Sequence, residues 1–257
     1  MTFELKQTTF LGAPVSYHVG GSGKPVLYLH SAGGVMLTQP LQDLTQSHQV
    51  FALVSPGFDG TEPNPQLSSI ADYVALVTEF ARQEIGERFD VIGSSFGSWV
   101  ALWLAVEEPA MVDHLILNVP AAFRFNGKGG LPADPAERFK ALYVHPQKIP
   151  DHARKAPEIM ANNGQLYEKL AGGVTVDEAL KARLPSVEAV TLILLGTEDK
   201  VVPAEAGEHL KRHIPVSQRV FIYDAAHSIE IDQPERVSRL WREFLTRGQG
   251  FVLNQGD

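Results

Sequence analysis

The stretch FDVIGSSFG, from Phe89 to Gly97, decides the fold of this chain. It begins as a short apolar run with strand character and ends in the pattern Gly-x-Ser-x-Gly, with Ser95 at its centre. The residues that follow, Phe96–Glu107, are predicted to form a helix. A serine on a sharp strand-to-helix turn is the usual setting of a nucleophilic hydroxyl, so Ser95 is the predicted nucleophile.

The two glycines of the pattern have a physical reason. The backbone of a residue on so sharp a turn is strained, and its neighbours two positions away are pressed against the surrounding chain. Side chains at Gly93 and Gly97 are therefore expected to collide with it. The turn also places the hydroxyl at a helix N-terminus, where the positive end of the helix dipole favours negative charge. Ser94 is the rival hydroxyl, but it lacks glycines two positions to either side.

Outward from this turn, short β-rich runs alternate with amphipathic segments, which indicates a mostly parallel sheet covered by helices. Several runs are continuously apolar, as central strands buried on both faces are. The eight expected strands are Phe3–Thr9, Ala13–Val19, Pro25–His30, Gln49–Ser55, Phe89–Gly93, Leu115–Val119, Val190–Leu195 and Arg219–Tyr223. The expected helices between and after them include Ser69–Gly86, Phe96–Glu107, Ala204–His213 and Pro234–Thr246.

One long segment, residues 121–185, interrupts this alternation because it contains no strand candidate. It holds Pro- and Gly-punctuated helical pieces, predicted at Pro135–Val144, His152–Asn162 and Val176–Arg183. A segment of this length inside an alternating domain indicates an inserted helical cap, although ordinary crossover helices are the alternative. The expected organisation is a core of residues 1–120 and 186–257 with a cap of residues 121–185. Candidates to line a pocket under it, or simply to form its core, are Phe123, Phe125, Tyr143, Met160 and Tyr167.

A serine hydroxyl needs a base, and a histidine must supply it. The chain order serine, acid, histidine leaves His209, His213 and His227. The first two are four residues apart on an expected surface helix, where a solvated face is a better interpretation than half a metal site. His227 follows the last strand, which puts it at the carboxyl edge of the sheet with Ser95. We therefore predict His227 as the base.

The third residue should be an acid after the strand that precedes the histidine's own strand. The stretch Gly196–Pro203 provides Asp199. We choose it over Glu198, because Gly196 ends the strand and the residues after Asp199 lead directly into the next helix. A loop aspartate is often only a helix cap or a turn former. Here its predicted role is to orient His227 and to stabilise the imidazolium that forms.

Two backbone N–H groups are expected to stabilise a developing negative charge. One belongs to Phe96, the residue after the predicted nucleophile, and the other to the turn that follows the strand Pro25–His30, at Ala32. Gly33 and Gly34 make this turn flexible enough to point N–H groups at an oxyanion. The alternative is that the two glycines simply open a helix.

Composition limits the class of protein. The net charge of −8 and the lack of a Lys/Arg cluster argue against a nucleic-acid partner. The absence of cysteine excludes disulfides, thiolate metal sites and a cysteine nucleophile. No signal peptide is recognisable, and the longest apolar run, Trp99–Val106, is too short to span a bilayer. The sequence therefore predicts a soluble cytoplasmic protein, monomeric or dimeric, without membrane association, metal or cofactor.

These motifs together resemble the α/β-hydrolase superfamily from about Tyr17 to Phe244. The matching pieces are Leu29–Gly34 for the His-Gly turn, Pro56–Thr61, Gly93–Gly97, Gly196–Pro203, and His227 with the trailing Asp232–Glu235. Two residues depart from the usual pattern: Ser31 stands where a glycine commonly follows the histidine, and Asp59 replaces a glycine, which we interpret as a loop variation. The resemblance implies the α/β-hydrolase fold, with an eight-stranded mostly parallel sheet, flanking helices and a helical cap.

The resemblance also implies hydrolysis of a small-molecule carboxylic ester through an acyl-enzyme. The surroundings of His227 resemble enol-lactonases and C–C hydrolases of aromatic breakdown as much as simple esterases. An enol-lactone or a ketonic C–C bond is therefore the alternative substrate. A receptor that has kept a hydrolase site, or a cofactor-free oxygenase on the same fold, is a further alternative. The intact set of expected site residues favours hydrolysis over both.

Overall fold

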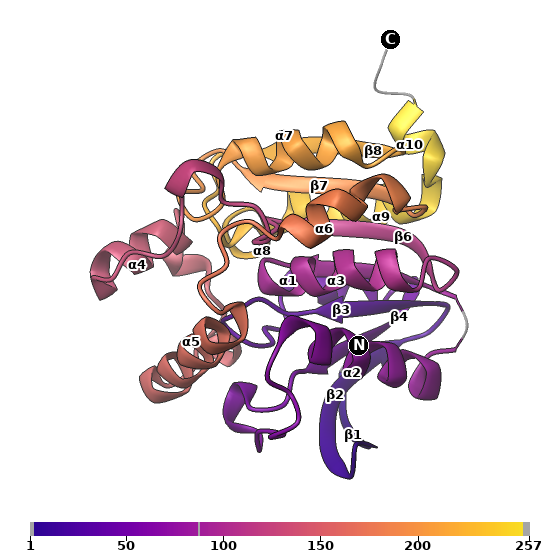
Figure 1. Cartoon of the computed structure of the whole chain (residues 1–257), viewed down its shortest axis with the longest axis horizontal. Helices are drawn as coiled ribbons and strands as arrows, with labels where there is room; N and C mark the ends of the chain where they lie inside the picture. The colour runs from indigo at the N-terminus through magenta and orange to yellow at the C-terminus, as the bar shows by residue number, and fades with distance from the viewer. Residues whose placement is uncertain (1–2, 87, 254–257) are drawn as a thin grey trace.

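The computed structural model describes residues 3–86 and 88–253, and it confirms the α/β architecture (Figure 1). Eight strands form one sheet in the order β1-β2-β4-β3-β5-β6-β7-β8. β1 pairs antiparallel with β2, and β2 with β4, whereas all later pairs are parallel. The strands are β1 Glu4–Phe10, β2 Ala13–Gly21, β3 Lys24–Leu29, β4 His48–Val54, β5 Phe89–Ser94, β6 Val112–Asn118, β7 Val190–Gly196 and β8 Ser217–Ile222.

Helices cover both faces of the sheet, and alternate strand residues divide between two cores. In β3, Leu27 and Leu29 pack towards α2 (Ile70–Glu84), α3 (Phe96–Glu107) and α7 (Ala204–His213). Val26 and Tyr28 pack on the other face with α1 (Gln39–Leu44), α9 (Pro234–Arg247) and α10 (Gln249–Leu253). Because successive residues of a strand point to opposite faces, a strand buried on both sides must be apolar throughout. This is the pattern from which the central strands were predicted.

The helix predictions hold closely where the end signals are strong. Ser69 caps α2: its Oγ accepts the N–H of Asp72 at 3.2 Å, and the Asp72 carboxylate accepts the N–H of Ser69 at 2.9 Å. This reciprocal capping box is the one that the spacing indicates. Three short helices were not predicted: α1, α8 (Ile229–Asp232) and α10. Among the described residues, no helix has both the length and the apolarity needed to cross a membrane.

The segment between β6 and β7 is largely helical and projects from one end of the sheet (Figure 1). It contains α4 (Pro135–Leu142), α5 (Pro157–Ala171) and α6 (Glu178–Arg183). Only an isolated antiparallel bridge, Phe123 to Val176, lies at its base. The helix predicted at His152–Asn162 was placed too early. Pro157 occupies the first turn of α5, where its fixed φ and missing N–H are tolerated, so the helix starts there.

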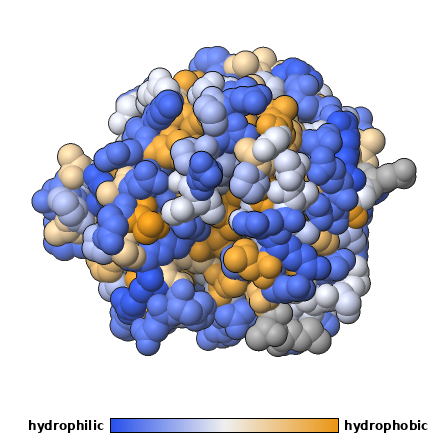
Figure 2. Space-filling model, turned by 90° about the horizontal axis from the view of Figure 1, so that it is seen from below, coloured by the Kyte–Doolittle hydropathy of each residue, from blue (hydrophilic) through white to orange (hydrophobic). Residues whose placement is uncertain are grey.

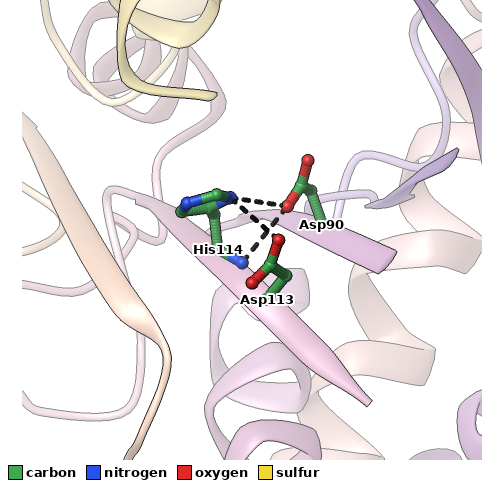
Figure 3. A group of neighbouring side chains, drawn as sticks. All are labelled: Asp90, Asp113 and His114. Carbon is green, nitrogen blue, oxygen red and sulfur yellow. Dashed lines mark hydrogen bonds and ion pairs between the residues drawn. The ribbon is translucent and has the colours of Figure 1, made fainter. Parts of the chain in front are cut away.

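At the amino ends of β3, β5 and β6, partly exposed charged side chains gather around the fully buried Asp90 carboxylate. Figure 3 shows the members of this cluster from β5 and β6. The Asp90 carboxylate accepts from His114 Nδ1 at 2.8 Å and from Lys24 Nζ at 2.7 Å, and Lys24 also contacts Asp113. The spacing of Asp90, Asp113 and His114 would suit a metal ion. However, the Lys24 ammonium already supplies the positive charge. Burial opposes the charged form of Lys24, but hydrogen bonds to Asp113 and Asp90 raise its pKa overall. We interpret the cluster as structural.

Replacing Lys24 with methionine should destabilise the fold by about 3 kcal/mol, because it leaves the fully buried Asp90 carboxylate without its cation. Urea unfolding at neutral pH measures this change. The matched control is Lys140→Met, which breaks a solvent-exposed pair with Glu137 and should leave the free energy of unfolding almost unchanged. Equal effects of the two substitutions would contradict the structural role of the cluster.

Candidate active site

The turn between β5 and α3 has the strained geometry expected of it. Ser95 lies at φ 52° and ψ −106°, and it caps the N-terminus of α3. A Cβ at Gly93 would lie 2.5 Å from the carbonyl oxygen of Gly97, and one at Gly97 would lie 2.0 Å from that of Leu29. Both contacts are with backbone that cannot move aside. The predicted reason for the two glycines is therefore confirmed.

The three predicted side chains lie together at the carboxyl edge of the sheet, where they form a continuous hydrogen-bonded chain. Ser95 Oγ lies 2.8 Å from Nε2 of His227, and Nδ1 of His227 lies 3.0 Å from Oδ2 of Asp199. Ser95 follows β5, Asp199 follows β7, and His227 follows β8. His227 and Asp199 are both buried, with side-chain exposures of 8% and 1%. A proton could pass from the hydroxyl to the imidazole along these hydrogen bonds without crossing solvent.

Asp199 is held by more than the histidine. Its second oxygen, Oδ1, accepts the backbone N–H groups of Val201 at 2.8 Å and Val202 at 2.9 Å. These bonds turn the carboxylate so that Oδ2 faces His227. Glu198, the rival acid, has an exposed side chain, and only its backbone N–H, which donates to Ala225, takes part in the turn. The local geometry thus favours Asp199.

The rival hydroxyl and the rival histidines lie elsewhere. Ser94 hydrogen-bonds Glu230 and Tyr28, which belong to the core on the α1 and α9 face of the sheet. His209 and His213 stack on each other on α7, with ring centroids 4.1 Å apart, and His209 also packs on Phe123. None of these side chains contacts Ser95 or Asp199 in the hydrogen bonds of the described chain. The structure leaves His227 as the partner of Ser95.

The turn after β3 is locked by its own hydrogen bonds. Gly34 N–H donates to the Ser31 carbonyl at 2.9 Å, and Gly33 N–H donates to Ser31 Oγ at 3.2 Å. The serine found in place of the usual glycine therefore adds a side-chain hydrogen bond to the backbone bond of the turn. No helix begins at Gly33 or Gly34, because α1 starts only at Gln39. Within residues 3–86 and 88–253, the N–H groups of Ala32 and Phe96 have no acceptor, so both are available as oxyanion donors.

The sequence did not reveal that Asp232 anchors the loop that carries His227. The Asp232 carboxylate accepts the N–H of Ala226 at 2.8 Å, directly before His227, and also the N–H groups of Val144 and His145. It thereby ties the loop of His227 to the segment between β6 and β7. In the sequence, the stretch Asp232–Glu235 is only part of the resemblance to the family. Its position five residues after the histidine was the available signal.

The sequence profile of the alpha/beta hydrolase family matches residues 26–240. The chain belongs to the α/β-hydrolase family. It is 25% identical to a 2-hydroxy-6-oxo-2,4-heptadienoate hydrolase of Pseudomonas putida, over 91% of this chain and 93% of that protein. It is 27% identical to a pimeloyl-[acyl-carrier protein] methyl ester esterase of Neisseria meningitidis, over 86% and 93% of the two chains.

Solved α/β-hydrolase structures share the fold. The meta-cleavage product hydrolase CumD superposes with a TM-score of 0.79 at 22% identity, over 95% of this chain and 98% of that one. A thermophilic esterase superposes with a TM-score of 0.74 at 20% identity, over 96% and 98%. The relatives of this α/β-hydrolase therefore include hydrolases of both ester and C–C bonds, and similarity alone does not choose between them.

His30 of this α/β-hydrolase fixes the base of the turn of residues 31–34, which we call the oxyanion turn after its predicted role. Its Nδ1 lies 2.6 Å from the Ser31 carbonyl oxygen, and its Nε2 accepts the Ser55 N–H at 3.1 Å. Nε2 can accept only in the neutral ring, so Nδ1 carries the proton. Burial lowers the pKa of His30 to about 4. The neutral imidazole therefore joins Ser31 to Ser55. Protonation of Nε2 would break its hydrogen bond to the Ser55 N–H.

This buried histidine predicts a pH dependence of stability. Because its pKa is lower in the folded chain than the usual 6.5, the unfolded chain binds more protons between pH 6.5 and 4. The stabilisation is present above pH 6.5 and is lost as the pH falls through 4, at up to about 3 kcal/mol. Urea unfolding of the wild type and of His30→Gln measures it. A pH dependence that is unchanged in the variant would rule out this assignment.

A surface groove lies away from these residues. The lower side of the molecule, which carries β1, α2 and α5, is mostly polar, with apolar side chains gathered in its middle (Figure 2). A groove of about 1060 Å³ opens between the β1–β2 turn, α2 and α3, and Leu11, Val74 and Trp103 are among its lining residues. Ser95, His227 and Asp199 do not line it. We therefore do not assign the reaction of this α/β-hydrolase to this groove.

Proposed function

We propose that the protein hydrolyses a small-molecule carboxylic ester by acyl-enzyme catalysis. The observation that carries the proposal is the continuous hydrogen-bonded chain from Ser95 Oγ through His227 to Asp199. Within the described residues, the N–H groups of Ala32 and Phe96 have no acceptor and could serve as the donors. Acyl transfer needs these four parts: a nucleophile, a base, a group that orients the base and donors for the oxyanion. The relatives that are ester hydrolases support the same reaction class.

In this mechanism, Ser95 Oγ attacks the ester carbonyl carbon while His227 Nε2 takes the hydroxyl proton. The carbonyl oxygen becomes an oxyanion held by the N–H groups of Ala32 and Phe96, each contributing about 10²–10³-fold. Collapse breaks the bond to the alkoxy group, which leaves as an alcohol with the proton from His227. Water then attacks the acyl-serine with His227 as the base, which releases the acid and restores Ser95.

We further propose that the segment between β6 and β7 acts as the cap over this site. Tyr167 of α5 packs on Phe96 with ring centroids 5.8 Å apart, so α5 reaches the residue after the nucleophile. Met160 lies beside Gly33 of the oxyanion turn. By contrast, Phe123 is fully buried and stacks on the partly buried Phe125, which favours a place in the core for Phe123.

A second candidate, cleavage of a ketonic C–C bond, is favoured by Arg124. The P. putida relative is named for a dienoate, and such a substrate carries a carboxylate. Arg124 has no carboxylate partner in the described chain, and its Nε is buried without an acceptor. Burial raises the pKa of Tyr167, which packs on Phe96, and the positive charge of Arg124 opposes this rise. An anionic substrate could therefore meet an uncompensated cation near the site, whereas a neutral ester would not need one.

A substrate panel separates the two candidates. The purified protein is offered short- and medium-chain p-nitrophenyl esters, methyl esters and 2-hydroxy-6-oxo-dienoates, and kcat/KM is measured for each. We expect the esters to be preferred. A dienoate preference that is lost in Arg124→Met but retained in Arg138→Met would favour the C–C reaction instead. Turnover of neither class, together with no labelling of Ser95 by a fluorophosphonate, would refute the proposed hydrolysis and favour a receptor or an oxygenase.

A further inference from the structure

Asp59, one of the two residues that depart from the family pattern, occupies a conformation that usually belongs to glycine. Its backbone lies at φ 56° and ψ 30°, in the left-handed region. Aspartate visits this region more readily than most residues but still at a cost relative to glycine. Gly57 and Gly60, on either side, also have positive φ values. An aspartate between them indicates that its carboxylate provides something that glycine cannot.

The Asp59 carboxylate bridges the oxyanion turn and α5. One oxygen accepts the backbone N–H of Val35 at 2.8 Å. The other accepts from Asn163 Nδ2 at 3.0 Å and forms an ion pair with Lys155. Asn163 also accepts the Asp59 N–H at 2.9 Å through Oδ1, so the two residues are bonded in both directions. The core loop after β4 and the segment between β6 and β7 are thus joined through one carboxylate.

The same two donors also fix the turn itself. The carbonyl oxygen of Gly33 accepts from Lys155 Nζ at 2.9 Å and from Asn163 Nδ2 at 3.1 Å. Asn163 is fully buried, and the side chains of Lys155 and Asp59 are only 14% and 18% exposed. Solvent therefore screens these contacts weakly. A Cβ at Gly34 would lie 1.9 Å from Asp59 Oδ1, which shows how closely the turn is enclosed.

We propose that Lys155 and Asn163 are positioning residues, which set the Ala32 N–H for the oxyanion by holding the adjacent Gly33 carbonyl. We call Asp59, Lys155 and Asn163 the polar clamp. This inference rests on the proposed function. The Gly33 carbonyl shares a peptide plane with the Gly34 N–H, which donates to the Ser31 carbonyl at 2.9 Å, and the Ser31 carbonyl shares its plane with the Ala32 N–H. Release of the Gly33 carbonyl therefore loosens, through this hydrogen bond, the plane that carries the Ala32 N–H. The oxyanion site is then complete only while α5 is docked on the core.

The test compares Lys155→Met with Lys148→Met in the full chain. Lys148 lies in the same segment and also donates to a core carbonyl, that of Asp232 at 2.5 Å, but away from the oxyanion turn. The readouts are kcat and KM for an aryl ester and the rate of Ser95 labelling by a fluorophosphonate, whose phosphoryl oxygen would occupy the oxyanion site. Urea unfolding is followed in parallel.

Lys155→Met should lower kcat and the labelling rate about 10- to 100-fold and change KM less than about threefold, because it misplaces an oxyanion donor. Lys148→Met should change both rates less than about twofold. Labelling of Lys155→Met at the wild-type rate, or equal slowing of both variants, would overturn the polar clamp but not the proposed function. No labelling of the wild type would overturn both.

A second variant keeps the test valid if Lys155→Met folds poorly because Asp59 is left unpaired. Asp59→Asn/Lys155→Met removes the ion pair without leaving a lone charge, and the new amide oxygen can still accept from Val35. The Gly33 carbonyl still loses its lysine donor. The double variant should therefore be more stable than the single one and still show the slow labelling. Recovery of the labelling rate together with stability would overturn the positioning role.

Discussion

Replacing Ser95 with alanine should lower kcat for an aryl ester about 10⁵- to 10⁶-fold, the largest effect of any single substitution in this chain. The residues of such a triad act as a unit, so loss of the nucleophile removes the covalent route altogether. Residual turnover would come from binding and from the two N–H donors alone. Initial rates at high enzyme concentration, together with mass spectrometry after fluorophosphonate treatment, measure the loss.

The fold should tolerate this change. Ser95 makes one side-chain hydrogen bond, to His227, and its strained backbone is held by Gly93, Gly97 and the strands around them. The free energy of unfolding should stay within about 1 kcal/mol of the wild type. Ser94→Ala is the matched control, since its hydroxyl faces Glu230 and Tyr28 on the other side of the sheet. If Ser94→Ala were inactive and Ser95→Ala active, the assigned nucleophile would be wrong.

The parts of the fold that the sequence predicts best are those with strong local signals. The central strands are apolar because both of their faces are buried, and each predicted strand overlaps an observed one. α3 and α7 match their predicted bounds, and the capping box at Ser69 marks the start of α2. Short helices such as α8, of four residues, have too few turns to show a period of 3.6.

In the candidate site, too, the residues with a local sequence signal could be predicted and the others could not. Ser95, Asp199 and His227 could be predicted because each follows a strand of a parallel sheet, and topology brings those strand ends to one edge. The polar clamp could not be predicted from the sequence. Lys155 and Asn163 belong to a segment whose docking on the core no local pattern reveals, and they meet Gly33 across more than a hundred residues.

Asp59 shows how such contacts stay hidden. At the sequence level it is only a departure from a glycine pattern, and we interpreted it as loop variation. The structure contradicts that interpretation, because its carboxylate bonds Val35, Lys155 and Asn163. Likewise Ser31 replaces a common glycine, and its hydroxyl, which a glycine would lack, accepts the Gly33 N–H in the oxyanion turn. In both positions a polar side chain restricts a loop that glycine would leave free.

The second large effect is expected from Asp199→Asn, which should lower kcat about 10⁴-fold. The amide keeps the size of the carboxylate but carries no charge, so it cannot stabilise the imidazolium that forms on His227. If its N–H₂ faces Nδ1, the ring is driven to the wrong tautomer, with its proton on the nitrogen that must accept from Ser95. KM should change little, because Asp199 is buried and does not reach a substrate.

Glu198→Gln is the matched control, since it neutralises the adjacent acid, whose side chain is exposed. It should keep activity within about twofold of the wild type, as surface substitutions of this kind do. The pair of variants decides which carboxylate serves His227. Near-full activity of Asp199→Asn with loss in Glu198→Gln would require the turn after β7 to rearrange. Oδ1 of Asp199 would then have to release the two N–H groups of Val201 and Val202 that now hold it in place.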